Sequence, residues 1–465
     1  MDKNTRIKNI EATIALDPDG FAKEEIVWKD TLQAMPVYKI KLEHLIYNKY
    51  NGRILTRTKS LEAQGKTINA ETKEGKELIE KLLWESREGR NKTTLEDLNQ
   101  WGQKKFGIIT RDGIIIDGNR RAMLLNRSGR YDYFKAIVLP VTLEQDPIEI
   151  EKLETSYQMG EDEKLGYNAN EKYLKAQTLR AKNVSVKEIA NWMNEPIGEI
   201  EKYLSVMSVM DEYLETFSYD KMYTRLDDRE DAFISVDKWT NNLYGEKSAK
   251  GFDGYTDGDV DDLKAIAFDY IRTIYEKVNN GGNKLDWKSL RILADGNKES
   301  HIFGNKEIWK DFAEQHFKFI DPIKIEEEPI NFDVPDLEKS LESRDSAFAE
   351  KTINFLTENL EDHRGKLGNQ KYANEPDKLL ARAIDAAKVA RANKNVGRDD
   401  VLDKVEELND ITVSIMRKKS PLILLKHIND LLSSVNPDSI DTSKEDIEEE
   451  LRKIQHTAYK LSKDL

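Results

Sequence analysis

The residues best suited to chemistry lie in one short stretch, residues 113–125, which reads GIIIDGNRRAMLL. Its apolar run ends at Asp117 and Gly118, and Arg120 and Arg121 then open a segment whose pattern predicts a helix. A glycine lets the backbone approach a ligand closely, the first N–H groups of a helix have no partner inside the helix, and arginine offers planar cationic forks. This combination predicts a site for an anion such as a phosphate or a carboxylate.

Two adjacent arginines at the positive end of a helix disfavour each other, and the helix dipole disfavours both. A solvated helix start, or an ion pair with Asp117, is one explanation of the pair. An anion that neutralises both arginines is the explanation we favour, with Asp117 capping or fixing the turn rather than acting as a base. Arg53, Lys104 and Lys105 are candidates to converge on the same anion. The chain has no Gly-x-x-x-x-Gly-Lys-Ser/Thr and no Gly-x-Gly-x-x-Gly, so the turn belongs to neither standard phosphate loop.

The chain is 465 residues long, which exceeds one ordinary core and predicts two to four domains. Hydrophobic residues make up 38% and charged residues 34%, a composition typical of a soluble protein with much exposed helix. The absence of cysteine excludes disulfides, thiolate metal sites and cysteine nucleophiles. The first residues lack the apolar core of a signal peptide and no apolar run approaches the length of a membrane span. We therefore expect a cytoplasmic protein with no membrane partner.

Charge is distributed unevenly along the chain. The formal net charge is -14, yet residues 31–140 contain 21 Lys and Arg against 13 Asp and Glu, a net charge of +8. The remaining residues therefore carry -22. The basic part contains the Gly-Asn-Arg-Arg turn, so it is the expected surface for a phosphate-bearing partner.

The elements that position this turn are predicted to form a small sheet with helices. Residues 37–42 alternate apolar and polar side chains like a strand, and residues 48–53 have turn chemistry. A helical insertion is expected at about 56–100. Residues 106–116 read as a hairpin, and residues 134–141 as a further strand of the same sheet.

Amphipathic helices follow after Pro147. Ser185 is expected to cap one helix with Glu188 as its capping-box partner, and residues 194–196 should end that helix. A second helix is predicted to run to about Met207, with a third from Asp211. The first two have helix-turn-helix spacing.

The predicted second helix of this pair is poorly suited to DNA. A recognition helix presents Arg, Lys, Asn or Gln to bases and phosphates. This one carries three glutamates and one lysine, which are Glu195, Glu199, Glu201 and Lys202. We therefore expect the pair to serve packing more than operator recognition, and any DNA to contact the basic N-terminal region, with Lys104 and Lys105 as candidates.

The remaining chain is predicted to be mainly helical. Residues 245–262 form a Gly- and Asp-rich loop that lacks calcium-binding spacing, and residues 321–342 carry three prolines among acidic residues and read as a linker. The C-terminal helices could form an internal bundle or join two copies of the chain. The expected division is a 1–36 extension, a 37–147 nucleotide/phosphate-binding domain, a 148–243 helical domain, a 244–320 helical region, the 321–342 acidic linker and a 343–465 helical domain.

The order of strand, turn, helix, hairpin, Gly-Asn-Arg-Arg turn, strand and helix-turn-helix resembles the ParB/sulfiredoxin superfamily, and ParB-like proteins in particular. The resemblance covers about residues 37–214. Residues 116–122 are similar to the family's Gly-Glu-Arg-Arg box, and Asn48 and Arg53 match its Asn-Pro-x-x-Pro-Arg segment. The family's third box, Glu-Asn-x-x-Arg, falls near residues 153–158, where Glu154 is the match.

This resemblance implies an α+β N-terminal ParB/sulfiredoxin-like domain with a small mixed sheet, followed by mainly α-helical domains that include a helix-turn-helix. It implies a nucleoside triphosphate with Mg²⁺ as the ligand, as the family's box holds the triphosphate of CTP. The residues it assigns to the nucleotide are Arg53, Gly118, Asn119, Arg120 and Arg121. It assigns the metal to Glu154, with residues 161–163 as an alternative acidic cluster. Sulfiredoxin chemistry requires a cysteine, which the chain lacks.

Three functions remain open at this point. The first is a nucleotide-gated DNA-binding dimer on double-stranded DNA. The second is a metal-dependent nuclease or phosphoryl-transfer enzyme on the same fold, with Glu154 or Asp117 as the catalytic carboxylate. The third is a non-enzymatic interaction module whose acidic C-terminal helices bind a protein partner.

Overall fold

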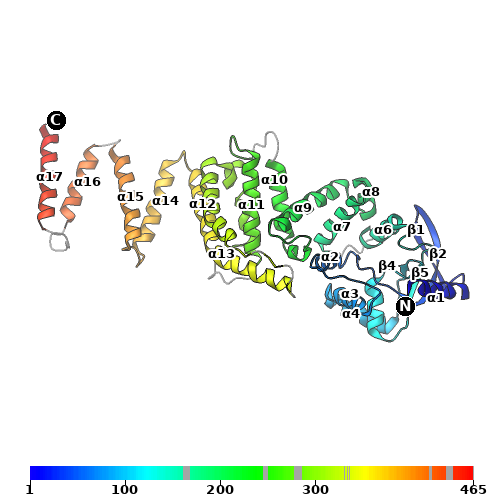
Figure 1. Ribbon diagram of the computed structural model, residues 1–465. Helices are drawn as coiled ribbons and strands as arrows, with labels where there is room; N and C mark the ends of the chain where they lie inside the picture. Colours follow the sequence, from blue (N-terminus) through cyan, green and yellow to red (C-terminus); the bar gives the residue numbers. More distant parts are fainter. Residues whose placement is uncertain are drawn as a thin grey trace. The chain divides into compact units, whose positions relative to one another are not determined.

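The computed structural model divides the chain into two compact units, Met1–Lys371 and Tyr372–Leu465 (Figure 1). Each unit is considered by itself. The described residues are 1–160, 168–243, 250–276, 285–328, 330–331, 334, 336–417, 421–435 and 444–463.

The first unit begins with a small mixed sheet in the order β1-β2-β5-β3-β4. Its strands are β1 (Ala22–Trp28), β2 (Thr31–Lys41), β3 (Gly107–Ile109), β4 (Ile115–Asp117) and β5 (Tyr133–Val138). β3 and β5 run parallel, while the pairs β1–β2, β2–β5 and β3–β4 are antiparallel. The predicted hairpin is confirmed as β3–β4.

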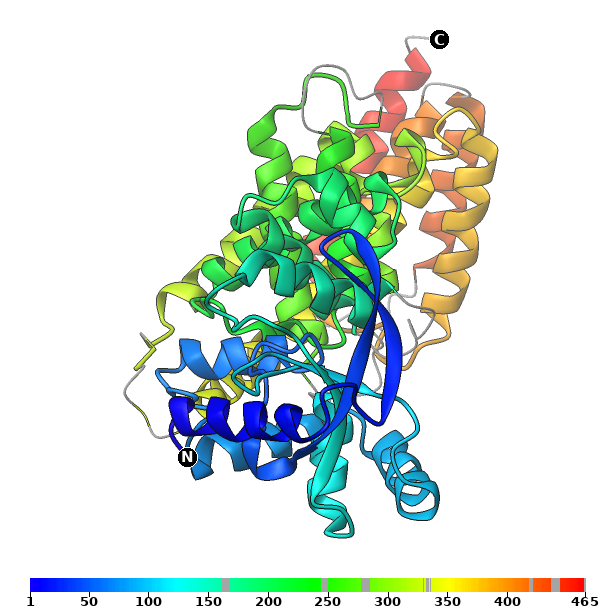
Figure 2. The same cartoon turned by 90° about the vertical axis from the view of Figure 1, so that its right-hand side faces the viewer.

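Residues 1–36, expected to be an N-terminal extension, form regular secondary structure that is part of the sheet domain. They contain helix α1 (Lys3–Leu16) and the long β1–β2 hairpin, and β2 begins six residues before the predicted strand start at Val37 (Figure 2). The hairpin turns through Lys29 and Asp30, whose φ values are 52° and 59°. Glycine usually occupies such positions, so the sequence carried no turn signal here.

Both faces of the sheet are covered by helices. Ile109, Ile115 and Phe134 face one core with residues from α1, α3 and α5. The neighbouring Ile108 and Ile116 face a second core with residues from α6. This alternation follows from the two-residue period of a strand. The helices of this part are α2 (Leu55–Ala63), α3 (Lys73–Glu85), α4 (Glu88–Trp101), α5 (Asn119–Ser128) and α6 (Pro147–Thr155).

The rest of the first unit is mostly helical. Its helices are α7 (Ala169–Ala181), α8 (Val186–Met193), α9 (Ile197–Thr216), α10 (Glu230–Leu243), α11 (Asp257–Ile274), α12 (Lys306–Ile325) and α13 (Leu337–Gln370). The capping box of Ser185 and Glu188 at the start of α8 is confirmed. The break predicted between Met207 and Asp211 is wrong, because α9 is continuous and no glycine or proline lies between them. Tyr203 and other residues along α9 are buried, so this helix packs into the core.

The expected linker at residues 321–342 is partly helix. α12 continues through Pro322 to Ile325, and α13 starts at Leu337, whose side chain is buried. α13 packs against α11 and α12. The boundary between the units therefore falls after Lys371 and not in the acidic segment.

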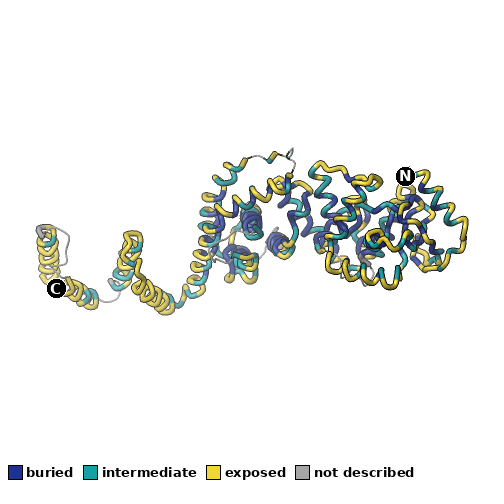
Figure 3. The backbone as a smooth tube through the Cα atoms, turned by 90° about the horizontal axis from the view of Figure 1, so that it is seen from below, coloured by how far each residue is buried: buried dark blue, intermediate teal, exposed yellow. Residues whose placement is uncertain are grey.

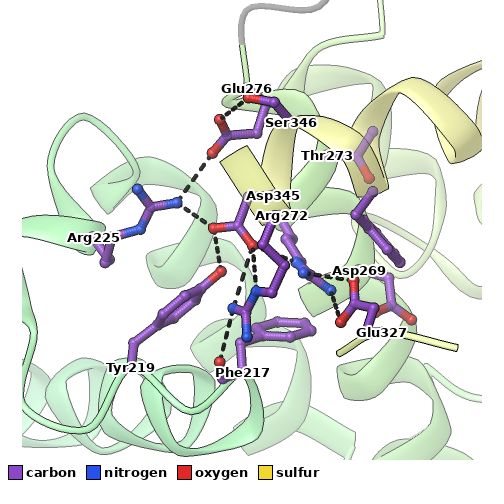
Figure 4. Close-up of polar contacts among 12 residues, drawn as sticks. Phe217, Tyr219, Arg225, Asp269, Arg272, Thr273, Glu276, Glu327, Asp345 and Ser346 are labelled. Atoms are coloured by element: carbon purple, nitrogen blue, oxygen red, sulfur yellow. Dashed lines mark hydrogen bonds and ion pairs between the residues drawn. The ribbon is translucent and has the colours of Figure 1, made fainter. Parts of the chain in front are cut away.

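A buried ionic cluster joins these helices (Figure 4). Asp345 on α13 pairs with Arg225, with Arg344 and, at 2.9 Å from its Oδ1 to Nε, with Arg272. The Tyr219 hydroxyl donates to its Oδ2. Burial alone would raise the pKa of Asp345, but the neighbouring arginines outweigh burial and lower it below its ordinary value. The carboxylate is therefore saturated with donors.

The second unit consists of amphipathic helices with exposed apolar residues. They are α14 (Pro376–Arg391), α15 (Asp399–Arg417), α16 (Pro421–Ser434) and α17 (Lys444–Lys463). No side chain described in this unit is buried, whereas the first unit has extensive buried cores (Figure 3). None of the helices in the described ranges combines the length and apolar character that crossing a membrane requires.

Candidate phosphate-binding site

The predicted turn joins β4 to α5. Gly118 is the N-cap of α5, with φ 100°, and no side chain in the described part of the chain caps this helix start. A Cβ atom at Gly118 would lie 2.7 Å from Cζ of Phe134 and 3.2 Å from Nη2 of Arg121. Glycine is therefore required at position 118 for two reasons, which are the left-handed backbone and the close neighbouring atoms. The first N–H groups of α5 remain for an anion.

A cavity of about 240 Å³ opens at this turn, and most of the predicted residues line it. Its walls carry five cations and two carboxylates, which are Arg53, Arg90, Lys105, Arg120, Arg121, Glu24 and Asp117. Gly118 and Asn119 also line it. The structure thus brings together residues that the sequence places almost seventy positions apart, and the described residues of the wall carry a formal excess of three positive charges.

Two wall residues were not predicted. Arg90 comes from α4, in the insertion, and Glu24 comes from β1, in the segment expected to be an extension. Neither belongs to a recognisable motif. Their positions depend on how the insertion and the β1–β2 hairpin pack, which local sequence does not reveal.

Arg121 is held in place at the cavity wall. Its Nη2 lies 2.5 Å from Oδ2 of Asp117 and donates to the carbonyl oxygen of Phe106 at 3.0 Å. Its Nε is buried without a hydrogen-bond partner in the described part of the chain. The ion pair considered from the sequence is therefore present, and it occupies Asp117. The Nε donor of the guanidinium therefore lies unpaired near Gly118 among the described residues.

Asn119 has a different role from the one its motif position suggests. Its side chain is buried, its Nδ2 donates to the carbonyl oxygen of Ile115 at 3.0 Å, and its Oδ1 accepts the backbone N–H of Asn48 at 2.9 Å. The Oδ1 contact thus joins the two predicted boxes, while the Nδ2 contact holds the side chain against the end of β4. Only its backbone N–H, at the start of α5, is placed for a ligand.

Glu154 is joined to the same network but lies outside the cavity. Its Oε1 accepts from Nδ2 of Asn48 at 2.9 Å and from Nε2 of Gln158 at 3.0 Å, and its Oε2 lies 3.7 Å from Nζ of Lys175. Burial raises the pKa of Glu154 to about 7. It lines a separate, larger cavity.

The predicted metal and catalytic roles find no matching geometry. Glu154 is occupied by Asn48, Gln158 and Lys175, and Asp117 by Arg121. In the described ranges, no group of three or more His, Asp or Glu side chains could hold a metal ion. The alternative cluster at residues 161–163 lies outside the described residues. The donor set at the cavity wall suits a phosphate, whereas it does not suit a metal held by protein carboxylates.

Lys104 and Lys105 diverge. Lys105 lines the cavity, whereas Lys104 is exposed with its Nζ 5.5 Å from the ring centroid of Trp101, a largely exposed side chain. Lys104 is therefore placed for a surface contact and Lys105 for the cavity ligand.

Comparison with known proteins adds no relative. No protein-family model matches the chain, and no curated protein does. Function must therefore be inferred from the geometry of the site.

Proposed function

We propose that the protein is a ParB-like, DNA-associated protein that binds a nucleoside triphosphate in the cavity at the start of α5. The observation that supports this most is the wall of five cations and two carboxylates around an uncapped helix start. Helix N-termini and arginine forks both favour phosphate oxygens. The phosphate chain binds Gly118, Arg120 and Arg121, with Arg53, Arg90 and Lys105 around it.

Mg²⁺, where present, is carried by the phosphates. A polyphosphate offers Mg²⁺ oxygen ligands of its own, and this ion normally keeps several waters. The protein's contribution is to bind and orient the phosphate chain through positive charge. Asp117 holds Arg121 in position, and Asn119 holds the Asn48 turn against α5.

The test is thermal stabilisation of the full chain by ATP, CTP, GTP and UTP, each with and without Mg²⁺. A nucleotide at about a hundredfold over its dissociation constant stabilises by about 2.7 kcal/mol. Arg120→Ala is expected to remove this stabilisation. Arg127→Ala is the matched control, because Arg127 is exposed on the same helix and packs on Trp84 outside the cavity. No stabilisation of the wild type by any nucleotide contradicts the proposal.

DNA binding is proposed for the basic N-terminal part and not for the start of α9. Lys104 and the exposed ring of Trp101 lie on this basic part, while Glu201 and Lys202 are exposed near the start of α9. Phosphate contacts by lysine make affinity depend steeply on salt. Fluorescence anisotropy with a DNA duplex, with and without nucleotide, should show weaker binding for Lys104→Ala. Equal binding by Lys104→Ala would contradict this assignment.

The unit Tyr372–Leu465 is proposed to join two copies of the chain. Leu402, Val405, Leu408 and Ile411 on α15 are all at least 39% exposed, and Val405 and Leu408, three residues apart, are neighbours on the helix surface. α17 has acidic residues in its first half and lysines in its last turn, so an antiparallel pair of α17 helices from two copies matches opposite charges.

Sedimentation velocity tests the pairing. Val405→Glu with Leu408→Glu should weaken self-association at least tenfold, because two charges would enter an apolar contact. Glu407→Gln on the same helix is the control and should leave it unchanged. A wild-type chain that stays monomeric at tens of micromolar excludes a dimer and favours a different protein partner.

A further inference from the structure

A second cavity, larger than the first, lies within the first unit between α2, α6 and α7. Its volume is about 710 Å³, which is in the range of small-molecule sites. Among the described residues, it shares no wall residue with the phosphate cavity. Part of its wall is apolar, with Tyr50, Leu55, Leu143 and Pro147 contributing.

Four lysines and three glutamates also line this cavity. They are Lys59, Lys175, Lys182, Lys221, Glu62, Glu151 and Glu154. By formal charge, these side chains nearly balance, with one lysine in excess. The ion pairs of the wall show which lysines are left without a carboxylate partner in the described part of the chain.

Every glutamate of this wall has a partner. Oε1 of Glu62 lies 2.6 Å from Nζ of Lys49, which is outside the wall. Glu151 pairs with Lys182 and, at 2.7 Å, with Lys175. Glu154 accepts the two amide hydrogen bonds described above. The carboxylates are thus satisfied by other groups.

Lys59 and Lys221 differ from the other two lysines. Within the described residues, neither ammonium makes a hydrogen bond or an ion pair. Burial has the largest effect on Lys59 and lowers its pKa, while Glu62 and Asp211 raise this pKa and Lys221 and Lys182 lower it. Lys59 is partly buried and Lys221 is exposed, so an anionic group at this end of the cavity would meet two ammonium groups that are not held in ion pairs with any described residue.

We propose that this cavity binds a small amphipathic organic anion, with its carboxylate or phosphate group at Lys59 and Lys221 and its aliphatic or aromatic body against Leu55, Leu143 and Pro147. The apolar wall disfavours a bare inorganic anion, because such an ion would lose hydration without gaining partners there. The two lysines favour an anion over a neutral apolar molecule, since a neutral molecule would form no ion pair with either ammonium group.

The test is isothermal titration calorimetry of the full chain with octanoate and with 1-naphthyl phosphate. Inorganic phosphate and 1-naphthol serve as the bare anion and the neutral body. Both amphipathic anions are expected to bind at one site per chain, at least tenfold more tightly than either comparison compound. Arg120→Ala should leave octanoate binding unchanged, which separates this cavity from the phosphate cavity.

Variants locate the site. Lys59→Ala with Lys221→Ala should weaken binding of both anions at least tenfold, and Lys66→Ala, an exposed lysine outside the wall, should not. Ala63→Trp is a second probe, because Ala63 is exposed at the end of α2 and a large ring there would occupy the cavity.

Three results would overturn the proposal. They are no binding of either amphipathic anion to the wild type, equal binding of inorganic phosphate or 1-naphthol, and unchanged binding in the folded lysine or Ala63→Trp variants. Loss of 1-naphthyl phosphate binding through Arg120→Ala, with no octanoate binding, assigns the phosphate compound to the other cavity and also contradicts the proposal.

Discussion

Two arginine-rich clusters in the first unit use the same residue type for opposite purposes. Around Asp345, three arginines and a tyrosine converge on one buried carboxylate, and Glu276 and Glu327 pair with Arg225 and Arg272 as well. At the start of α5, the described wall residues include five cations and two carboxylates. The first cluster contains its own anions, and the described part of the second has an excess of positive charge. Supply of carboxylates, rather than the number of arginines, therefore distinguishes a structural cluster from a candidate anion site.

Removing Asp345, the carboxylate at the centre of the buried ionic cluster, should have the largest effect on stability. Asp345→Ala leaves the buried guanidinium of Arg272 and its neighbours without their shared counter-charge, and breaking such a buried pair typically costs about 3–5 kcal/mol. The free energy of unfolding from urea denaturation measures this loss. Asp385→Ala is the control, because Asp385 pairs with Lys388 on exposed helix α14 and such pairs contribute little. A loss for Asp345→Ala no larger than the control's would mean that the cluster is not structural.

At the cationic cavity beside α5, stability should instead depend on the glycine of the turn, Gly118. Gly118→Ala places a Cβ 2.7 Å from the Phe134 ring at a φ of 100°, which should cost about 2 kcal/mol in unfolding free energy. Gly129→Ala separates the two causes, since Gly129 also has a positive φ, at the other end of α5, but has no atom within 4 Å of the added Cβ. The expected cost at Gly129 is smaller. Equal costs would show that strain alone, and not the close approach, requires glycine at the turn.

Local chemistry explains which parts of this site were predictable. Gly118 and the two arginines after it form a contiguous motif, and the Ser185–Glu188 cap depends on residues three apart, so both could be found from the sequence. The β3–β4 hairpin likewise follows from its two short apolar runs and the turn between them.

The missed features depend on distant packing. Strand β1 contains Lys23, Glu24 and Glu25, which obscure its alternation, and only Ile26 and Trp28 are buried. Glu154 was expected at a metal site, but Lys175, twenty-one residues later, lies beside it. Periodicity and spacing carry no information about such a neighbour. The split between Lys104 and Lys105 similarly depends on where the strand bends into the sheet.

A substitution of Arg90 tests whether the helical insertion contributes to nucleotide binding in the cavity at the start of α5. Arg90→Ala removes one of the five wall cations and is expected to weaken nucleotide binding about tenfold, or about 1.4 kcal/mol. Titration calorimetry with the nucleotide that stabilises the wild type measures this. Lys92→Ala is the matched control, because Lys92 is exposed on the same helix and does not line the cavity. Equal affinities of the two variants would restrict the site to the turn itself.

The smallest effect for each step of the experiment is a dependence of stability on pH. Asp345 has a lowered pKa because arginines outweigh its burial, whereas burial raises the pKa of Glu154 to about 7 from an ordinary value of 4.5. Between pH 4.5 and about 7, the folded protein keeps a proton on Glu154 that the unfolded chain has lost. The free energy of unfolding should therefore fall by about 1 kcal/mol for each pH unit as pH rises from 5 to 7.

Glu154→Gln should remove this slope, because glutamine does not titrate and can still accept the hydrogen bonds from Asn48 and Gln158. Urea denaturation of both proteins at several pH values gives the difference directly, and other titrating groups cancel in it. Thr155→Ala, in the same turn and also buried, should change stability while keeping the wild-type slope. The slope could persist in Glu154→Gln, or the free energy of unfolding of the wild type could rise with pH. Either result would mean that Lys175 keeps Glu154 charged. The carboxylate would then be as fully paired as Asp345, and the contrast between the two buried acids would disappear.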